Sequence, residues 1–137
     1  MEYKKQYWDD IFSVQIKLKR ATYLEAESLR QLLNWELEKE FKKVIIDLSE
    51  CAFIDPVFLG VLISSLKKLV ILGGNLKIVL PPNSYNLDNN ILKSLRIFDT
   101  YKSHHEAVES YKKVFVTPQN EEKYLEDVPE TRVLFSV

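Results

Sequence analysis

The feature that most constrains the fold is a strand–helix–strand pattern in the middle of the chain. Residues 44–48 are an apolar run rich in β-branched side chains, which is typical of a strand buried on both faces. Asp55 and Pro56 match a helix start, with Asp as the N-cap and Pro at the first helical position. Glycines at 73–74 predict the end of that helix, and residues 76–80 form a second apolar run. A crossover of this length predicts parallel pairing of the two strands.

Weaker patterns on either side extend this unit into an α/β domain. Alternating apolar and polar residues at 14–19 predict a half-exposed strand, and leucines at helical spacing predict a helix over about residues 24–40. A short helix is expected near 87–95 and a short strand at 97–98. We therefore expect a single domain with a mostly parallel or mixed central β-sheet and helices packed on it.

The last part of the chain follows a different pattern. Ser103 is the expected N-cap of a further helix, with Glu106 three residues later completing a capping box. We expect the domain to span residues 1–111 and residues 112–137 to be a C-terminal extension. Within that extension two strand-like runs flank an acidic connector, at 114–116 and 132–135.

Composition excludes several classes of function. Hydrophobic residues make up 46% of the 137 residues and charged residues 28%, as in an ordinary globular domain. The formal net charge of −1 offers no electrostatic basis for nucleic acid binding. No apolar run is long enough to span a membrane, the first ten residues lack a signal-peptide core, and Cys51 is the sole cysteine. These features predict a cytoplasmic protein without a membrane span.

Three segments of the central unit resemble the signature of STAS domains, the family of anti-sigma factor antagonists and of sulfate-transporter cytoplasmic tails. They are Asp-Leu-Ser at 47–49, Phe-Ile-Asp at 53–55 and Leu-Gly-Val-Leu at 59–62. The resemblance covers roughly residues 11–111. It implies a regulatory module that binds another protein, such as an anti-sigma factor or a kinase-like regulator.

The resemblance also identifies a departure at the start of the second helix. Family members usually read Asp-Ser-Ser-Gly-Leu-Gly where residues 55–60 read Asp-Pro-Val-Phe-Leu-Gly. The second serine of that motif is the residue that is typically phosphorylated in the antagonists, and Val57 stands in its place. The resemblance therefore implies a domain that is not switched by phosphorylation at this position. Ser49, a loop hydroxyl, is an alternative phosphorylation site.

The helix expected over residues 56–72 carries apolar side chains on two faces. At about 100° per residue, the side chains that fall on the core side are Leu59, Leu62, Ile63, Leu66, Leu69 and Val70. Val57, Val61 and Ile71 fall on the opposite side, with Phe58 at its flank. An exposed apolar stripe of this kind indicates an interaction surface.

The predicted partner-binding residues are Asp55, Val57, Phe58 and Val61. A different protein or a second copy of the chain is expected to contact them, and the alternative is that residues 112–137 fold back over the stripe. The alternative function is a soluble STAS-like assembly subunit of a transporter or signalling complex. The two functions differ in the partner that the same surface would hold.

The sequence predicts no enzyme, metal or cofactor. His104 and His105 are adjacent and point in different directions on a helix, and no Cys/His set with ligand spacing accompanies them. Asp47 is explained as a polar residue at a strand end, and Cys51 as a small buried apolar residue without a matched base. No nucleophile, base and oxyanion donor occur together in adjacent motifs.

Overall fold

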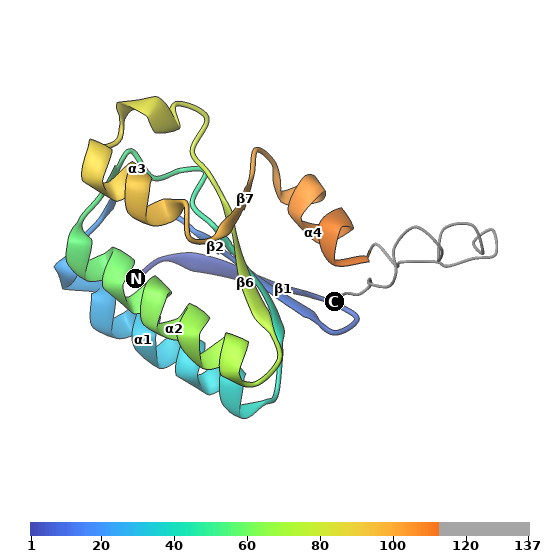
Figure 1. Ribbon diagram of the computed structural model, residues 1–137. Coiled ribbons are helices and arrows are strands. Elements are labelled where there is room, and N and C mark those ends of the chain that lie inside the picture. The colour runs from blue at the N-terminus through green and yellow to red at the C-terminus, as the bar shows by residue number, and fades with distance from the viewer. Residues whose placement is uncertain (113–137) are drawn as a thin grey trace, which may run out of the picture.

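The computed structural model describes residues 1–112, which form one central sheet with helices on both faces (Figure 1). The strands and helices follow one another in this order: β1 (Tyr3–Trp8), β2 (Ile11–Ile16), β3 (Arg20–Ala21), α1 (Tyr23–Glu38), β4 (Lys43–Asp47), β5 (Phe53–Ile54), α2 (Pro56–Ile71), β6 (Asn75–Val79), the short 3-10 helix η1 (Ser84–Asn86), α3 (Asn89–Leu95), β7 (Asp99–Tyr101) and α4 (His104–Lys112).

The central sheet is mixed, as predicted. Its five strands lie in the order β1-β2-β4-β6-β7, with β1 antiparallel to β2 and every other pair parallel. The predicted parallel pairing across α2 is confirmed by the register of β4 with β6. β3 and β5 form a separate two-stranded parallel sheet close to the starts of α1 and α2.

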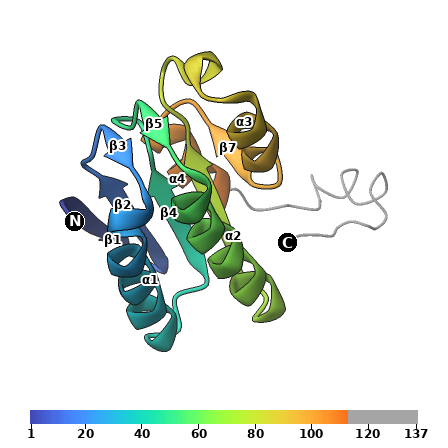
Figure 2. The same ribbon diagram turned by 90° about the vertical axis from the view of Figure 1, so that its left-hand side faces the viewer.

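Helices cover the central sheet from two sides. α1 and α2 lie side by side on one face (Figure 2), and α4 covers the other face. The residues of β4 show why both faces are apolar. Val44 and Ile46 pack into the larger core under α1 and α2, while Ile45 packs into a smaller core with Ala107 and Val108 of α4. Successive side chains of β4 therefore pack alternately against the helices on the two faces of the sheet.

The two ends of α2 follow the local signals in the sequence. Asp55 is the N-cap and Pro56 the first helical residue. At the other end Gly73 has a φ of +86°, and the Gly74 amide donates to the Leu69 carbonyl at 2.7 Å, which is the pattern of a Schellman cap. Gly74 has a further constraint, because an added Cβ would collide with the carbonyl oxygen of Lys42.

The strands differ from the prediction in several places. The strand expected at 14–19 is β2, which spans Ile11–Ile16 and is buried, so its predicted half-exposure is wrong. The short strands β3 and β5 were not expected. The short strand expected at 97–98 is wrong: these residues form hydrogen-bonded turns after α3, and the strand is β7, which begins at Asp99. β1 was not expected at all. It is an exposed edge strand joined to β2 by a tight turn in which Asp9 has a φ of +52°, so burial imposes no apolar alternation on it.

Some predictions fall on residues outside this description. The strand-like runs at 114–116 and 132–135, and the suggestion that residues 112–137 fold back over α2, lie wholly or almost wholly there. Within residues 1–112, no helix combines the length and hydrophobicity needed to cross a membrane.

Candidate functional site

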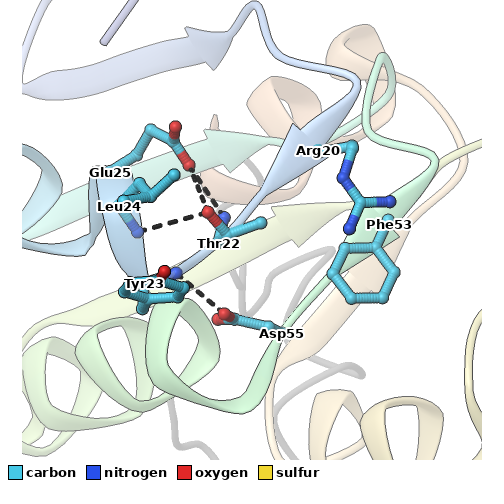
Figure 3. A pocket seen from close by; sticks show the side chains of 7 residues that line it. All are labelled: Arg20, Thr22, Tyr23, Leu24, Glu25, Phe53 and Asp55. Carbon is cyan, nitrogen blue, oxygen red and sulfur yellow. Dashed lines mark hydrogen bonds between the residues drawn. The ribbon is translucent and has the colours of Figure 1, made fainter.

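Asp55 lies where the two long helices begin. Its Oδ1 accepts a hydrogen bond from the Phe58 amide at 2.8 Å, which caps α2, and its Oδ2 accepts one from the Tyr23 amide at 2.8 Å, in the first residue of α1 (Figure 3). One carboxylate therefore joins the starts of two helices that are 32 positions apart in sequence. Both oxygens are occupied by backbone donors, so Asp55 positions this end of the molecule.

The start of α1 has its own cap. The Thr22 hydroxyl accepts from the Leu24 amide at 3.2 Å, and Glu25 Oε1 accepts from the Thr22 amide at 2.9 Å. Thr22 and Glu25 thus form a capping box, as Figure 3 shows. The polar side chains between the two helices are used to hold backbone groups, and this leaves few of them to act on a substrate.

Around these caps lies a shallow, open cavity of about 470 Å³. The residues that line it come from β3, β5 and the starts of the helices: Arg20, Thr22, Tyr23, Leu24, Glu25, Phe53 and Asp55. The Arg20 guanidinium lies 4.2 Å from the centre of the Phe53 ring, a cation–π contact that is visible in Figure 3.

Apolar side chains are exposed around this cavity. Leu24 is 72% exposed, and Tyr23 and Phe53 are also exposed. Val57, at the start of α2, is 54% exposed. We call these four side chains, together with the Arg20 guanidinium, the entry surface. Isolated exposed apolar residues are ordinary, but four of them from three neighbouring elements form a patch suited to binding.

The predicted site residues fall in different environments. Val57 is exposed, and Val61 is half-buried against the larger core. Phe58 is fully buried, so its predicted position at the flank of an exposed stripe is wrong. It precedes the buried Leu62 by four residues and therefore lies on the same helical face. Val70, assigned to the core, is exposed instead, and this is also a correction.

Sequence reasoning did not identify Arg20, Tyr23, Leu24 or Phe53 as site residues. A signal for two of them was present, because the Thr-Tyr-Leu-Glu sequence at 22–25 has the spacing of a capping box and places Tyr23 and Leu24 in a first helical turn. Nothing local indicates that Phe53, some thirty residues later, lies beside them. Pairing of β3 with β5 brings these segments together.

The reactive side chains considered from the sequence lie elsewhere. Cys51 is buried, and desolvation first, followed by the charges of Asp47 and Glu50, raises the pKa of its thiol to about 12. The Asp47 Oδ1 accepts from the Ser49 amide at 2.9 Å, which is a turn contact. In the described part of the chain, no three His, Cys, Asp or Glu side chains are grouped so that they could hold a metal ion.

His104 makes a contact that the sequence did not suggest. Its Nε2 lies 2.6 Å from the Ser13 hydroxyl, and its ring packs against Trp8 with 4.9 Å between ring centres. Burial lowers the pKa of His104, against a smaller opposing effect of Asp47. Ser13 is buried in β2 and His104 is half-buried, so this pair attaches α4 to the sheet.

Comparison with known proteins agrees with this architecture. The Thermotoga maritima protein TM1081, described as a candidate anti-sigma factor antagonist, has 25% identity and a TM-score of 0.68, over 81% of this chain and 95% of its own. An anti-sigma factor antagonist from Mycobacterium paratuberculosis has 18% identity and a TM-score of 0.69, over 82% and 94%. Unphosphorylated SpoIIAA, the Bacillus anti-sigma factor antagonist, has 10% identity and a TM-score of 0.67, over 82% and 100%.

The last two of these similarities show the fold alone, because their sequence identity is low. No curated protein sequence matches the chain. The model of the STAS domain family matches residues 15–107, which is well over half of the chain. The protein therefore belongs to the STAS domain family.

Proposed function

We propose that this protein is a non-enzymatic regulatory module that binds another protein through the entry surface. The observation that carries the proposal is the exposure of Tyr23, Leu24 and Phe53 around one cavity at the paired helix starts. Val57, in the first turn of α2, is exposed as well. Burial of such side chains against a partner is favourable by about 25 cal/mol per Å² of apolar area. Aromatic and Arg side chains at the centre of a contact commonly carry much of the binding energy.

The class of partner follows from the family. Several solved structures with this fold are named anti-sigma factor antagonists, so an anti-sigma factor or a kinase-like regulator is the partner that we propose. The role is supported by the site itself, since its carboxylates and hydroxyl are engaged in helix caps. The polar groups of the patch are already hydrogen-bonded in the helix caps, so none of these groups is free to act as a base or nucleophile. The exposed apolar side chains are suited to binding another protein.

We further propose that serine phosphorylation at the start of α2 does not control this binding. Val57 has no hydroxyl to accept a phosphoryl group, and its exposed side chain adds apolar area to the entry surface. A phosphoserine at this position would place a charge of about −1.5 to −2 in the contact. Incubation with the partner kinase and ATP followed by peptide mapping tests the claim. Stoichiometric phosphate on Ser49, Ser64 or Ser65 that abolishes binding would contradict its simple form, in which serine phosphorylation does not control the module.

The main test compares two charge substitutions at opposite ends of the helical layer. Leu24→Asp combined with Val57→Asp disrupts the entry surface, and Ile71→Asp is the matched control, because Ile71 is 83% exposed at the far end of α2. We expect the parent and the control to capture the same regulator from a cell extract, and the double variant to lose it. Calorimetry with the purified regulator then measures the loss, and circular dichroism confirms the fold.

Two other results have defined meanings. Capture of a transporter subunit by the entry surface would favour the alternative role as an assembly subunit. A concentration-dependent dimer that the double variant abolishes would identify a second copy as the occupant. Equal binding by the parent and the double variant would contradict the proposed surface.

A further inference from the structure

A second and larger cavity lies at the opposite end of the parallel strands from the entry surface. Its volume is about 1570 Å³, and it is bounded by the β1–β2 turn, the segment between α1 and β4, the end of α2, the start of β6 and the end of α4. None of its lining residues belongs to the entry surface. We call it the lysine cavity, because lysine is its most frequent lining residue.

Positive charge exceeds negative charge in this lining. The five lysines are Lys39, Lys42, Lys43, Lys77 and Lys112, and the three acidic residues are Asp9, Asp10 and Glu40, so five minus three leaves +2. Asp10 pairs with Lys43 at 2.9 Å, and Lys39 lies 3.7 Å from Glu36, which is outside the lining. The lining lysines without a salt bridge among residues 1–112 are therefore Lys42, Lys77 and Lys112. The chain as a whole has a formal net charge of −1, so this excess is local.

Lys77, on β6, is the unusual member of the set. It is only 8% exposed, although lysine is rarely buried without a charged partner. Its Nζ donates to the Ser110 hydroxyl at 2.7 Å and lies 4.1 Å from the centre of the Tyr111 ring. Within residues 1–112 it forms no salt bridge. Its Nζ also lies 5.4 Å from the centre of the Tyr101 ring, so its partners in this part of the chain are one hydroxyl and two aromatic rings.

The surrounding groups hold this ammonium in place. The Ser110 hydroxyl donates its proton to the Ala107 carbonyl at 2.7 Å, so its lone pair is directed to Lys77. The single Tyr111 O–H lies within hydrogen-bond distance of two backbone carbonyl oxygens, Val44 of β4 at 2.9 Å and Asn75 of β6 at 2.8 Å, and the hydroxyl oxygen accepts from the Val44 amide at 3.2 Å. These bonds fix the ring under the ammonium. Lys77 therefore presents a fixed positive charge, with two N–H groups beyond the one used by Ser110, to the cavity that it lines.

We propose that the lysine cavity is an oxyanion-binding site in which Lys77 contacts a phosphate or carboxylate group, with Lys42 and Lys112 adding positive charge to the lining. Ammonium–oxyanion hydrogen bonds are short and about twice as strong as neutral ones. The site is independent of the proposed function, since it shares no residue with the entry surface.

Two sources supply this chemistry. One is a free phosphorylated or carboxylated small molecule. The other is the chain itself, because residue 113 follows the cavity residue Lys112 directly, and five side-chain carboxylates occur later in the sequence, at Glu121, Glu122, Glu126, Asp127 and Glu130. A tethered carboxylate would compete with a free anion at a high effective concentration.

The first arm of the test titrates the full chain with inorganic phosphate and pyrophosphate. Ionic strength is held constant so that screening does not imitate binding. Amide shifts of β6 and α4 report occupancy. Lys77→Met should weaken binding at least about tenfold, whereas Lys67→Met, an exposed lysine of α2 outside the cavity, should leave it unchanged. Ser110→Ala should weaken it by a smaller factor, and it carries the test if Lys77→Met does not fold.

The second arm distinguishes the two sources. A full-length variant with Glu121→Gln, Glu122→Gln, Glu126→Gln, Asp127→Asn and Glu130→Gln removes the five side-chain carboxylates that follow Lys112. If the chain fills its own site, the parent does not respond to phosphate and this variant does, again depending on Lys77. If a free anion fills it, both respond alike. A response of neither protein, or one that Lys77→Met leaves intact in both, would overturn the proposal.

Discussion

The two ends of the sheet differ in which groups are satisfied by the protein. Polar groups are hydrogen-bonded at the entry surface, and a charged group is left without an ionic partner from residues 1–112 at the lysine cavity. At the entry surface the carboxylate of Asp55 is engaged by two backbone amides, and apolar side chains such as Leu24 remain exposed. At the lysine cavity the apolar ring of Tyr111 lies beneath a buried ammonium, and the charge of Lys77 is the unpaired element among the described residues. The first end therefore suits association by apolar burial, and the second suits recognition of charge.

This difference shows that exposure alone does not identify a binding surface. Val57 is informative because it is exposed and apolar, and Lys77 because it is buried and charged. Each departs from the usual location of its residue type. The following predictions test whether the two ends differ in this way, beginning with the largest expected effect.

Phe58 separates the entry surface from the core directly beneath it. Because Phe58 is fully buried, Phe58→Ala should reduce the free energy of unfolding by about 3–5 kcal/mol. Val57→Ala, one position earlier and exposed, should change it by no more than about 0.5 kcal/mol. Urea denaturation of both variants measures the difference. An equally small loss of unfolding free energy in both variants would mean that Phe58 is exposed and belongs to the entry surface.

Asp55 tests whether the entry surface depends on the helix caps. Asp55→Ala removes the acceptor for the Phe58 and Tyr23 amides, and we expect a loss of about 1–2 kcal/mol. The measurement is again urea denaturation. Glu27→Ala, an exposed substitution in α1 away from the caps, is the control and should cost far less. A loss for Asp55→Ala no greater than that of the control would mean that the shared carboxylate is not needed to join the helices.

Salt should affect the two ends differently. Raising NaCl from about 0.05 to 0.5 M shortens the screening length several-fold. We expect phosphate binding at the lysine cavity to weaken several-fold, and partner binding at the entry surface to change by less than about twofold, because apolar burial is not screened. Calorimetry at both concentrations measures the two affinities. Similar salt dependence at both ends would remove the distinction between them.

The smallest expected effect concerns pH on the α4 face of the sheet. Burial lowers the pKa of His104 in the folded state, so the unfolded state takes up a proton more readily. The resulting stability is fully present above the unfolded pKa of about 6.5 and is lost as pH falls through that value. Urea denaturation at pH 7.5 and 5.5 should show a loss that is smaller in His104→Gln. An identical loss in both proteins would assign the pH dependence to carboxylates.

The local signals of the sequence were sufficient for much of the fold. Asp55-Pro56 and Gly73-Gly74 identified both ends of α2, because N-caps and left-handed C-terminal residues depend on a few neighbouring backbone groups. Ser103 also caps α4 as expected, accepting from the Glu106 amide at 3.1 Å. The apolar runs of β4 and β6 predicted their burial and parallel pairing.

The candidate site could be predicted only in part from local sequence signals. Helical spacing identified the leucine face of α2, but it placed Phe58 and Val70 on the wrong sides, because the centre of a buried stripe depends on how the helix is rotated against the sheet. β1 was missed, since an edge strand has no buried face to impose a pattern.

The sequence by itself determined the family, the strand–helix–strand unit and the residue that begins α2, since each depends on neighbouring residues along the chain. Only the tertiary structure decided that Asp55 also holds the start of α1, that Phe53 lies against Arg20, and that Lys77 is buried against Tyr111. These are contacts between residues about thirty positions apart. Such contacts arise from the pairing of strands and the packing of helices on the sheet, which no local pattern encodes.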